Sequence, residues 1–275
     1  MSNGQLKIGV FDSGFGGLTV LRALLPLLPG AEFLYLGDTA RLPYGSKSRA
    51  TIVRYALSST RFLLDQGAEF LVIACNTASA LALKEIREST EVPVVGMIET
   101  GANEARSQSK TRDILVIGTD ATISSHAYAA ACRERGLRAM EKACPLLVPL
   151  VEEGWVDHPV TAEVVRIYLT ELLQQAQESD LDPDTLVLGC THYPLLRPMM
   201  EAALSPAIRV IDSARATASQ AAQQLAGHRF TGGHAGSSSC SCRFFATDSV
   251  AKFRNLGTRF LGSPIHEVEL VDLGG

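Results

Sequence analysis

The most regular feature of the chain is a series of short apolar runs that alternate with longer amphipathic stretches. The runs are three to six residues long and lie at residues 7–11, 32–36, 70–74, 93–98, 114–117, 185–188 and 209–211. Such continuous apolar runs are typical of parallel strands buried on both faces. Between them, apolar residues recur every three or four positions, which predicts helices at 17–28, 48–66, 79–88, 125–135 and 162–177. The pattern predicts an open α/β fold, in which ligands bind beyond the carboxyl ends of the strands.

The two halves of the chain carry a weak internal repeat. Residues 71–77 (LVIACNT) match residues 186–192 (LVLGCTH), and the runs before and after them also pair in order, 8–11 with 114–118 and 92–95 with 208–211. Three pairs in one order at similar spacing predict two similar α/β domains with mostly parallel sheets, which face each other across a central cleft. At 275 residues the chain is long for one hydrophobic core and sufficient for two.

Composition narrows the function classes. The chain is 46% hydrophobic and 20% charged, and its formal net charge of −4 argues against non-specific nucleic-acid binding, which depends on clustered Lys and Arg. No apolar run is long enough for a transmembrane helix, and the first residues do not resemble a signal peptide, so we expect a cytoplasmic protein without a membrane partner. A small anionic ligand remains compatible with this charge, because helix N-termini bind anions locally.

Six cysteines need an explanation, because a disulfide framework is not expected in a cytosolic chain of this size. Two of them, Cys75 and Cys190, directly follow the paired strands of the internal repeat and precede small polar residues. If the two halves face each other, both thiols reach one cleft from opposite sides. Taken singly, each would more often be a buried small hydrophobic residue.

Two thiols on opposite faces of one carbon suit the inversion of a stereocentre. Such a reaction needs a base on one face and an acid on the other, and a thiol can serve as either near neutral pH if its neighbours tune it. Asp12 is the candidate to assist Cys75, and His192 is the candidate to assist Cys190. Because an amino-acid α-proton is weakly acidic, the carbanion also needs hydrogen-bond donors in a dry site. Candidates for these donors are Ser13, Asn76, Thr77 and Thr191.

Other interpretations of the same motifs stay open at this point. The turn at residues 11–17 (FDSGFGG), together with Asp38, partly resembles a nucleotide-binding turn, which would make the protein a nicotinamide-dependent oxidoreductase, but the third glycine of the fingerprint is missing. A two-lobed binding protein without enzymatic activity is a third hypothesis. Residues 227–242 read as a Ser/Gly-rich surface loop before a strand at 243–246, and the Cys240-x-Cys242 spacing is shorter than is usual for zinc, so we expect no metal site.

Five motifs in order resemble bacterial glutamate racemases of the aspartate/glutamate racemase superfamily. They are FDSGFGG from Phe11, LPYG from Leu42, ACNTAS around Cys75, EEG from Glu152 and GCTHYPLL around Cys190. The resemblance extends from about Ile8 to Leu273 and implies a cofactor-independent interconversion of L- and D-glutamate, with D-glutamate supplied to peptidoglycan. Aspartate or another amino acid is the alternative substrate.

The resemblance also implies roles for individual residues. Cys75 and Cys190 become the catalytic acid/base pair, assisted by Asp12 and His192. The implied substrate-binding residues are Asp12, Ser13, Tyr44, Gly45, Asn76, Thr77, Thr191 and His192, and further candidates are Glu153, Thr119 and Thr122. Residues 1–97 with 212–275 should form the first domain and residues 98–211 the second. The expected partner is the small-molecule substrate, with a homodimer left open.

Overall fold

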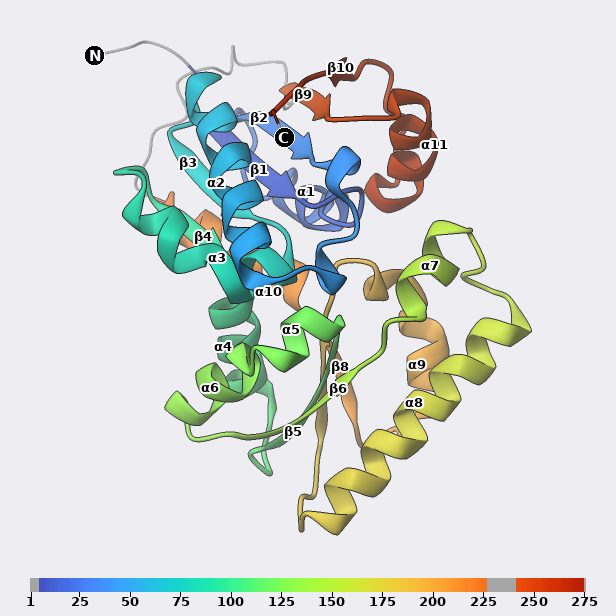
Figure 1. Cartoon of the computed structure of the whole chain (residues 1–275). Helices are drawn as coiled ribbons and strands as arrows, with labels where there is room; N and C mark the ends of the chain where they lie inside the picture. The colour runs from blue at the N-terminus through green and yellow to red at the C-terminus, as the bar shows by residue number, and fades with distance from the viewer. Residues whose placement is uncertain (1–4, 227–240, 275) are drawn as a thin grey trace.

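The structure is a computed structural model that describes residues 5–226 and 241–274, and two parallel β-sheets form its frame (Figure 1). The first sheet has six strands in the order β10-β9-β2-β1-β3-β4. Its strands are β1 (Lys7–Asp12), β2 (Glu32–Gly37), β3 (Phe70–Ile73), β4 (Val94–Gly96), β9 (Ser241–Ala246) and β10 (Glu269–Leu270). All of its strand pairs are parallel, and β9 and β10 bring the C-terminal part of the chain back to this sheet.

The second sheet repeats the topology of the first on a smaller scale. It has four parallel strands in the order β6-β5-β7-β8, namely β5 (Asp113–Gly118), β6 (Arg138–Ala143), β7 (Thr185–Gly189) and β8 (Arg209–Asp212). The repeat seen in the sequence pairs β1 with β5, β3 with β7 and β4 with β8, and each pair holds the same place in its sheet. The predicted fold class, two parallel-sheet α/β domains, is therefore confirmed. The domain boundaries at 97/98 and 211/212 stay a prediction.

Helices connect successive strands and cover the sheets (Figure 1). The helices that belong with the first sheet are α1 (Leu18–Leu24), α2 (Arg49–Asp65), α3 (Asn76–Glu88), α10 (Ser213–Gln224) and α11 (Val250–Leu261). Helix α4 (Met97–Gln108) connects the first sheet to the second. The helices between the first and last strands of the second sheet are α5 (Asp120–Ser124), α6 (Ala127–Glu134), α7 (Leu147–Glu152), α8 (Pro159–Glu178) and α9 (Arg197–Ala203). Short 3-10 turns are η1 (Thr39–Arg41), η2 (Tyr44–Ser46) and η3 (Tyr193–Leu196).

Alternation along the strands assigns side chains to the two faces of each sheet. In β1, Ile8 and Val10 belong to the core that includes α1 and α10, whereas Phe11 belongs to the core that includes α2 and α3. All three side chains are fully buried. Because both faces are covered, the strand reads as one continuous apolar run, which is why the sequence pattern located it.

The pattern misplaced some element ends and missed other elements. The run at 93–98 is a strand only to Gly96, because Met97 begins α4, and the helix expected from Ser79 already begins at Asn76. The pattern did not predict β6, an edge strand whose side chains are exposed or half-buried. It also missed α10, whose buried face of Ala214, Thr217, Ala218 and Ala221 carries little hydrophobic contrast.

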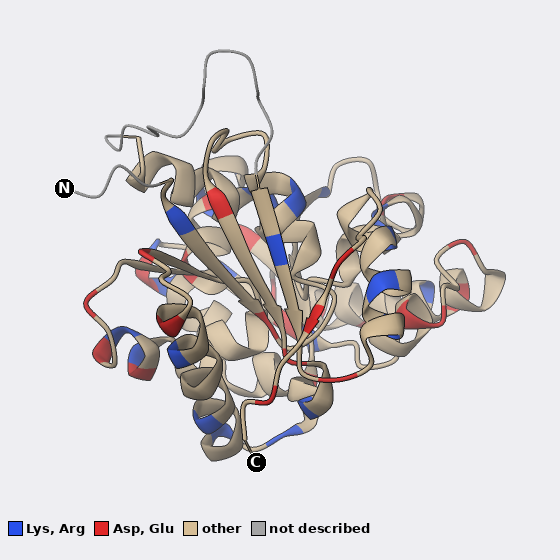
Figure 2. Ribbon diagram, turned by 90° about the horizontal axis from the view of Figure 1, so that it is seen from above, with Lys and Arg blue, Asp and Glu red and all other residues tan. Residues whose placement is uncertain are grey.

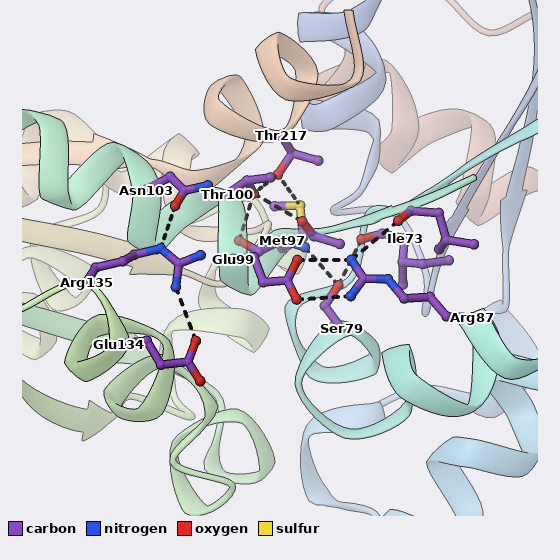
Figure 3. Close-up of polar contacts among 12 residues, drawn as sticks. Ile73, Ser79, Arg87, Met97, Glu99, Thr100, Asn103, Glu134, Arg135 and Thr217 are labelled. Carbon is purple, nitrogen blue, oxygen red and sulfur yellow. Dashed lines mark hydrogen bonds and ion pairs between the residues drawn. The ribbon is translucent and has the colours of Figure 1, made fainter. Parts of the chain in front are cut away.

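Polar contacts around α4 fix the passage from the first sheet to the second (Figure 3). Ser79 Oγ donates to the Ile73 carbonyl and accepts from the Met97 amide, both at 3.0 Å. Thr100 and Thr217 share a buried hydroxyl contact of 2.7 Å between α4 and α10. On the surface Arg87 forms two 3.0 Å bonds with Glu99. These contacts bind α4 to α3 and α10, so the start of the second half is held against the first.

Lys and Arg residues are interspersed with Asp and Glu residues along the outer helices and loops (Figure 2). None of the described helices is long and apolar enough to cross a membrane. Of the two cysteines considered for zinc, Cys240 lies outside the described residues and Cys242 lies in β9.

Candidate active site

A cavity of about 500 Å³ lies beyond the carboxyl ends of the strands, and both sheets contribute to its wall. The volume is within the usual range for a small-molecule site. Cys75, which follows β3 of the first sheet, and Cys190, which follows β7 of the second, both line it. The remaining lining residues are Ser13, Phe15, Thr39, Leu42, Pro43, Tyr44, Gly45, Ser46, Asn76, Thr77, Thr119, Asp120, Pro145, Val148, Pro149, Glu152, Thr191, His192, Asp248, Ser249 and Lys252.

Cys75 occupies the N-cap position of α3, directly after β3. Its Sγ lies 3.5 Å from Ser13 Oγ, and the backbone N–H groups of Ala78 and Ser13 bond to the sulfur. These donors would stabilise a thiolate. Burial and the nearby charge of Asp12 outweigh them, however, and raise the pKa of Cys75 to about 12. In this structure the thiol form of Cys75 is therefore the stable one.

Asp12 ends β1 and lies behind the cavity wall. Its Oδ2 accepts the backbone N–H groups of Gly14 and Gly17, each at 3.0 Å, while its buried Oδ1 has no partner among the described residues. Burial raises the pKa of Asp12, although the Gly17 amide and the charge of His192 oppose the rise. Since the amides of the glycine turn bind this carboxyl, they are not available for a nucleotide phosphate, which argues against the oxidoreductase interpretation.

His192 is the charged neighbour of Cys190. Its Nδ1 lies 3.9 Å from Cys190 Sγ, and its Nε2 lies 3.3 Å from Glu152 Oε1. Burial alone would lower the pKa of His192, but its hydrogen bonds to Cys190 and Glu152 raise it to about 10. Burial pushes the pKa of Glu152 up, yet His192 and Lys252 together hold it below its ordinary value. The Cys190 side of the cavity therefore carries an imidazolium, whereas the Cys75 side carries a carboxyl.

Helix α11 brings the C-terminal part of the chain to the second half of the site. Lys252 Nζ lies 3.6 Å from Glu152 Oε2, and the ring of Phe260 meets the ring of His192 edge to face at a centroid distance of 5.1 Å. Figure 1 shows α11 above α7 on the same side of the molecule. His192 is thus held in place by residues that are far from it in the sequence.

Hydroxyl and amide groups of Thr77, Thr119 and Asn76 form part of the cavity wall, and the Thr122 hydroxyl lies behind it. Thr77 Oγ1 lies 3.0 Å from Thr119 Oγ1 and 3.1 Å from Thr122 Oγ1, and Thr119 and Thr122 lie 2.9 Å apart. Asn76 begins α3 and is almost fully buried, and its Nδ2 has no partner among the described residues. These groups can donate hydrogen bonds to an anion in the cavity.

Tyr44 and Gly45 lie in the turn η2, as the LPYG motif suggested. The Tyr44 hydroxyl donates to Asp38 Oδ2 at 2.5 Å, and Thr247 donates to Asp38 Oδ1 at 3.0 Å. Because these bonds occupy both oxygens of Asp38, its carboxyl is not free to bind the ribose that the oxidoreductase interpretation requires.

Glycines allow the two halves to approach closely at the cavity. A Cβ on Gly16 would lie 2.2 Å from Thr191 Oγ1 and 2.6 Å from His192 Nδ1. A Cβ on Gly45 would lie 2.8 Å from Thr119 Cβ. Neither gap has room for a methyl group, so both positions need glycine in this arrangement.

Most residues expected at the site do line one cavity. Asp12 and Thr122 lie behind the wall and contact residues that line it, whereas Glu153 is exposed at the end of α7 and its neighbour Glu152 lines the cavity instead. No sequence motif identified Lys252 or Asp248 as site residues, although both line the cavity. Among the described residues, no cluster of three His, Cys, Asp or Glu side chains could hold a metal ion.

Comparison with known proteins agrees with this geometry. Residues 16–221 match the Asp/Glu/Hydantoin racemase family. The chain belongs to this family. It is 51% identical to a glutamate racemase of Koribacter versatilis, with 100% of both chains covered. Among family structures, it is similar to a glutamate racemase isoform of Bacillus anthracis, with a TM-score of 0.88, 37% identity and 98% of each chain covered.

A second family structure bears on the ligand. The glutamate racemase of Francisella tularensis, solved in complex with D-glutamate, matches with a TM-score of 0.87 and 34% identity over 98% of each chain. As a member of this family, the chain is an amino-acid racemase, in agreement with the resemblance seen in the sequence.

Proposed function

We propose that the protein is a glutamate racemase that interconverts L- and D-glutamate by proton transfer between Cys75 and Cys190 without an added cofactor. The observation that carries this proposal is that two thiols, one from each sheet, line the same cavity. Relatives of up to 51% identity are named glutamate racemases, which supports glutamate as the substrate. Aspartate is the alternative substrate.

Each turnover moves one proton on each face of the substrate. A thiolate on one face takes the α-proton, so the Cα–H bond breaks and its electron pair remains on the substrate as a carbanion. The thiol on the opposite face then delivers its own proton to Cα, which forms the new C–H bond and leaves that sulfur as a thiolate. The roles of the two sulfurs are exchanged for the other enantiomer.

The two sides of the cavity support these roles in different ways. His192 Nδ1 lies 3.9 Å from Cys190 Sγ, so the imidazolium places a positive charge beside that sulfur. The pKa of Cys75 is raised to about 12, so this thiol can deliver a proton. For Cys75 to act as the base, a positive charge must offset its burial, and the ammonium group of the substrate supplies one.

Donors around the cavity stabilise the charge that develops on the substrate. We assign this task to Ser13, Asn76, Thr77 and Thr191, with Tyr44, Gly45 and Thr119 completing the binding surface. Asp12 and His192 assist their cysteines, and Glu152 positions His192. We further propose that the enzyme acts in the cytoplasm and that its D-glutamate is consumed in peptidoglycan synthesis.

Exchange of the α-proton in deuterated water tests the reaction and the substrate together. The protein is incubated separately with L-glutamate and L-aspartate, without any added cofactor, and α-deuteration and circular dichroism are followed. With glutamate, we expect the D-enantiomer formed at early times to carry deuterium while the remaining L-enantiomer does not. Exchange of aspartate alone would reassign the substrate, and no exchange of either would refute the proposal.

Single-thiol variants test the two-base mechanism. Cys75→Ala and Cys190→Ala should each lose racemisation, because one face then lacks its proton carrier. Circular dichroism should show retained secondary structure, since each change removes only one sulfur. Full two-way turnover in either variant would rule out the proposed proton path.

A further inference from the structure

Tyr128 is a fully buried tyrosine of α6 that contacts the neighbours of both catalytic cysteines. Its hydroxyl donates a 2.7 Å hydrogen bond to Oδ1 of Asn76, the residue after Cys75. Its ring lies against Gly189, the residue before Cys190, where an added Cβ would be 2.9 Å from Tyr128 Cε2. Tyr128 thus contacts both halves of the molecule: Gly189 at the end of β7 in the second sheet, and Asn76 at the start of α3, which follows β3 of the first sheet.

The packing around Tyr128 leaves its hydroxyl little freedom. A Cβ on Gly101 of α4 would lie 3.0 Å from the Tyr128 oxygen, so α4 confines the hydroxyl from another side. Burial also raises the pKa of Tyr128, which keeps the phenol protonated. The hydroxyl is therefore a fixed donor aimed at Asn76.

This bond decides which end of the Asn76 amide remains available. A primary amide has one accepting oxygen and one donating nitrogen, and rotation about its last side-chain bond exchanges them at little steric cost. With Oδ1 engaged by Tyr128, the buried Nδ2 has no partner among the described residues, although Asn76 lines the cavity. An unpartnered buried donor is costly unless a ligand completes it.

We propose that Tyr128 is a positioning residue that holds the Asn76 amide with its N–H₂ group toward the cavity, ready to bind a carboxylate of the substrate. Without the phenol hydroxyl, the amide can rotate and present its oxygen, which repels a carboxylate. This inference rests on the proposed function only in the identity of the ligand. The orientation of the Asn76 side chain can be tested without any substrate.

A double-mutant cycle between the two residues is the kinetic test. Tyr128→Phe keeps the ring and removes only the hydroxyl, and we expect it to lower kcat/KM for glutamate by roughly tenfold, mainly through a higher KM. Asn76→Ala should cost at least as much. In the Asn76→Ala background, Tyr128→Phe should have almost no further effect, because the group that it positions is gone. An equal loss in both backgrounds, or no loss in the single variant, would overturn the assignment.

A matched control separates positioning from the loss of a buried hydroxyl bond. Thr217→Val also removes a buried hydroxyl that bridges two helices, at 2.7 Å from Thr100, but Thr217 does not line the cavity (Figure 3). This variant should keep the KM of the unmodified protein. If Thr217→Val raises KM as much as Tyr128→Phe does, the effect reflects packing between the helices and the inference is wrong.

A spectroscopic readout keeps this inference separate from the proposed function. The side-chain amide signals of Asn76 can be assigned in a ¹⁵N-labelled protein by their loss in Asn76→Ala. In Tyr128→Phe, without ligand, these signals should shift and broaden, whereas Thr217→Val should leave them in place. Unchanged signals would overturn the positioning role even if racemisation is confirmed. Conversely, failure of glutamate to exchange would refute the proposed function and leave this measurement valid.

Discussion

Replacement of Glu152 by glutamine removes one negative charge from the neighbourhood of His192 at nearly constant side-chain size. The Glu152 Oε1 atom lies 3.3 Å from His192 Nε2, and the carboxyl also pairs with Lys252 at 3.6 Å. Unit charges about 4 Å apart interact by about 4 kcal/mol at an effective dielectric constant of about 20 and by about 1 kcal/mol in water. Because Lys252 partly neutralises Glu152 and the carboxyl is partly exposed, we expect the interaction between Glu152 and His192 to lie toward the lower end of this range.

That interaction converts into a measurable change of the His192 pKa. At about 1.4 kcal/mol per pKa unit, the loss corresponds to a decrease of about 1 to 2 units. The pKa of His192, which the hydrogen bonds to Cys190 and Glu152 raise to about 10 against the effect of burial, should therefore fall to about 8 to 9. The His192 imidazolium is then lost at lower pH. In the mechanism proposed above, the alkaline limb of the kcat/KM profile should therefore move down by the same amount.

Two measurements test the coupling between Glu152 and His192. The pH profile of kcat/KM is recorded for both proteins, and the His192 ring is titrated by NMR, with His192→Asn used to assign its signal. Since enantiomers have equal free energies, kcat/KM must stay equal in the two directions in every variant, which provides an internal control. The coupling would be refuted if Glu152→Gln left both the alkaline limb and the His192 ring titration where they are in the unmodified protein.

The same pKa shift predicts how stability depends on pH. The folded-state pKa of His192 lies above its ordinary value of 6.5, so the stabilisation from its protonation is complete below pH 6.5 and is lost as the pH rises through about 10. The difference in unfolding free energy between the unmodified protein and Glu152→Gln should therefore shrink toward pH 10, as measured by urea denaturation. A difference that grows with pH would contradict this sign.

Three further predictions concern single positions. Gly16→Ala should lower kcat/KM at least tenfold in steady-state assays, because the new methyl group would lie 2.2 Å from Thr191 Oγ1. Activity equal to that of the unmodified protein would show that the halves separate freely. Asp12→Asn should speed alkylation of Cys75 by iodoacetamide severalfold at fixed pH, since the Asp12 charge adds to burial in raising the pKa of that thiol; slower alkylation would contradict the sign. Thr161→Val should stabilise the fold by about 1 kcal/mol in urea denaturation, because it removes a fully buried hydroxyl that has no partner among the described residues. Destabilisation would indicate that the hydroxyl has a partner.

The sequence pattern located the parts of the fold that are buried on both faces. β1, β3, β5 and β7 are continuous apolar runs, and the repeat between the two halves correctly predicted that Cys75 and Cys190 reach one cavity. β6 was missed because an edge strand with half-exposed side chains has no such run. Helix α10 was missed because its buried face consists of alanine and threonine.

The neighbours that tune the site were harder to predict, because they meet only in three dimensions. Lys252 reaches Glu152 through the packing of α11 opposite α7, and nothing in the local sequence around Lys252 marks it as a site residue. The amides expected to stabilise a Cys75 thiolate are present, yet burial raises the pKa of Cys75 to about 12. The degree of burial depends on the whole fold, so a short motif does not reveal it.

The matching strand orders of the two sheets have a geometric consequence for an enzyme that must treat mirror images alike. A protein made of L-amino acids contains no mirror plane, so its two related halves can be superposed only by a rotation. A rotation that interchanges the two sulfurs would also interchange two substituents of the planar carbanion. An ammonium group and a carboxylate cannot replace one another. In the mechanism proposed above, the two sides of the site therefore cannot be equivalent, and the carboxyl of Asp12 on one side and the imidazole of His192 on the other make them different.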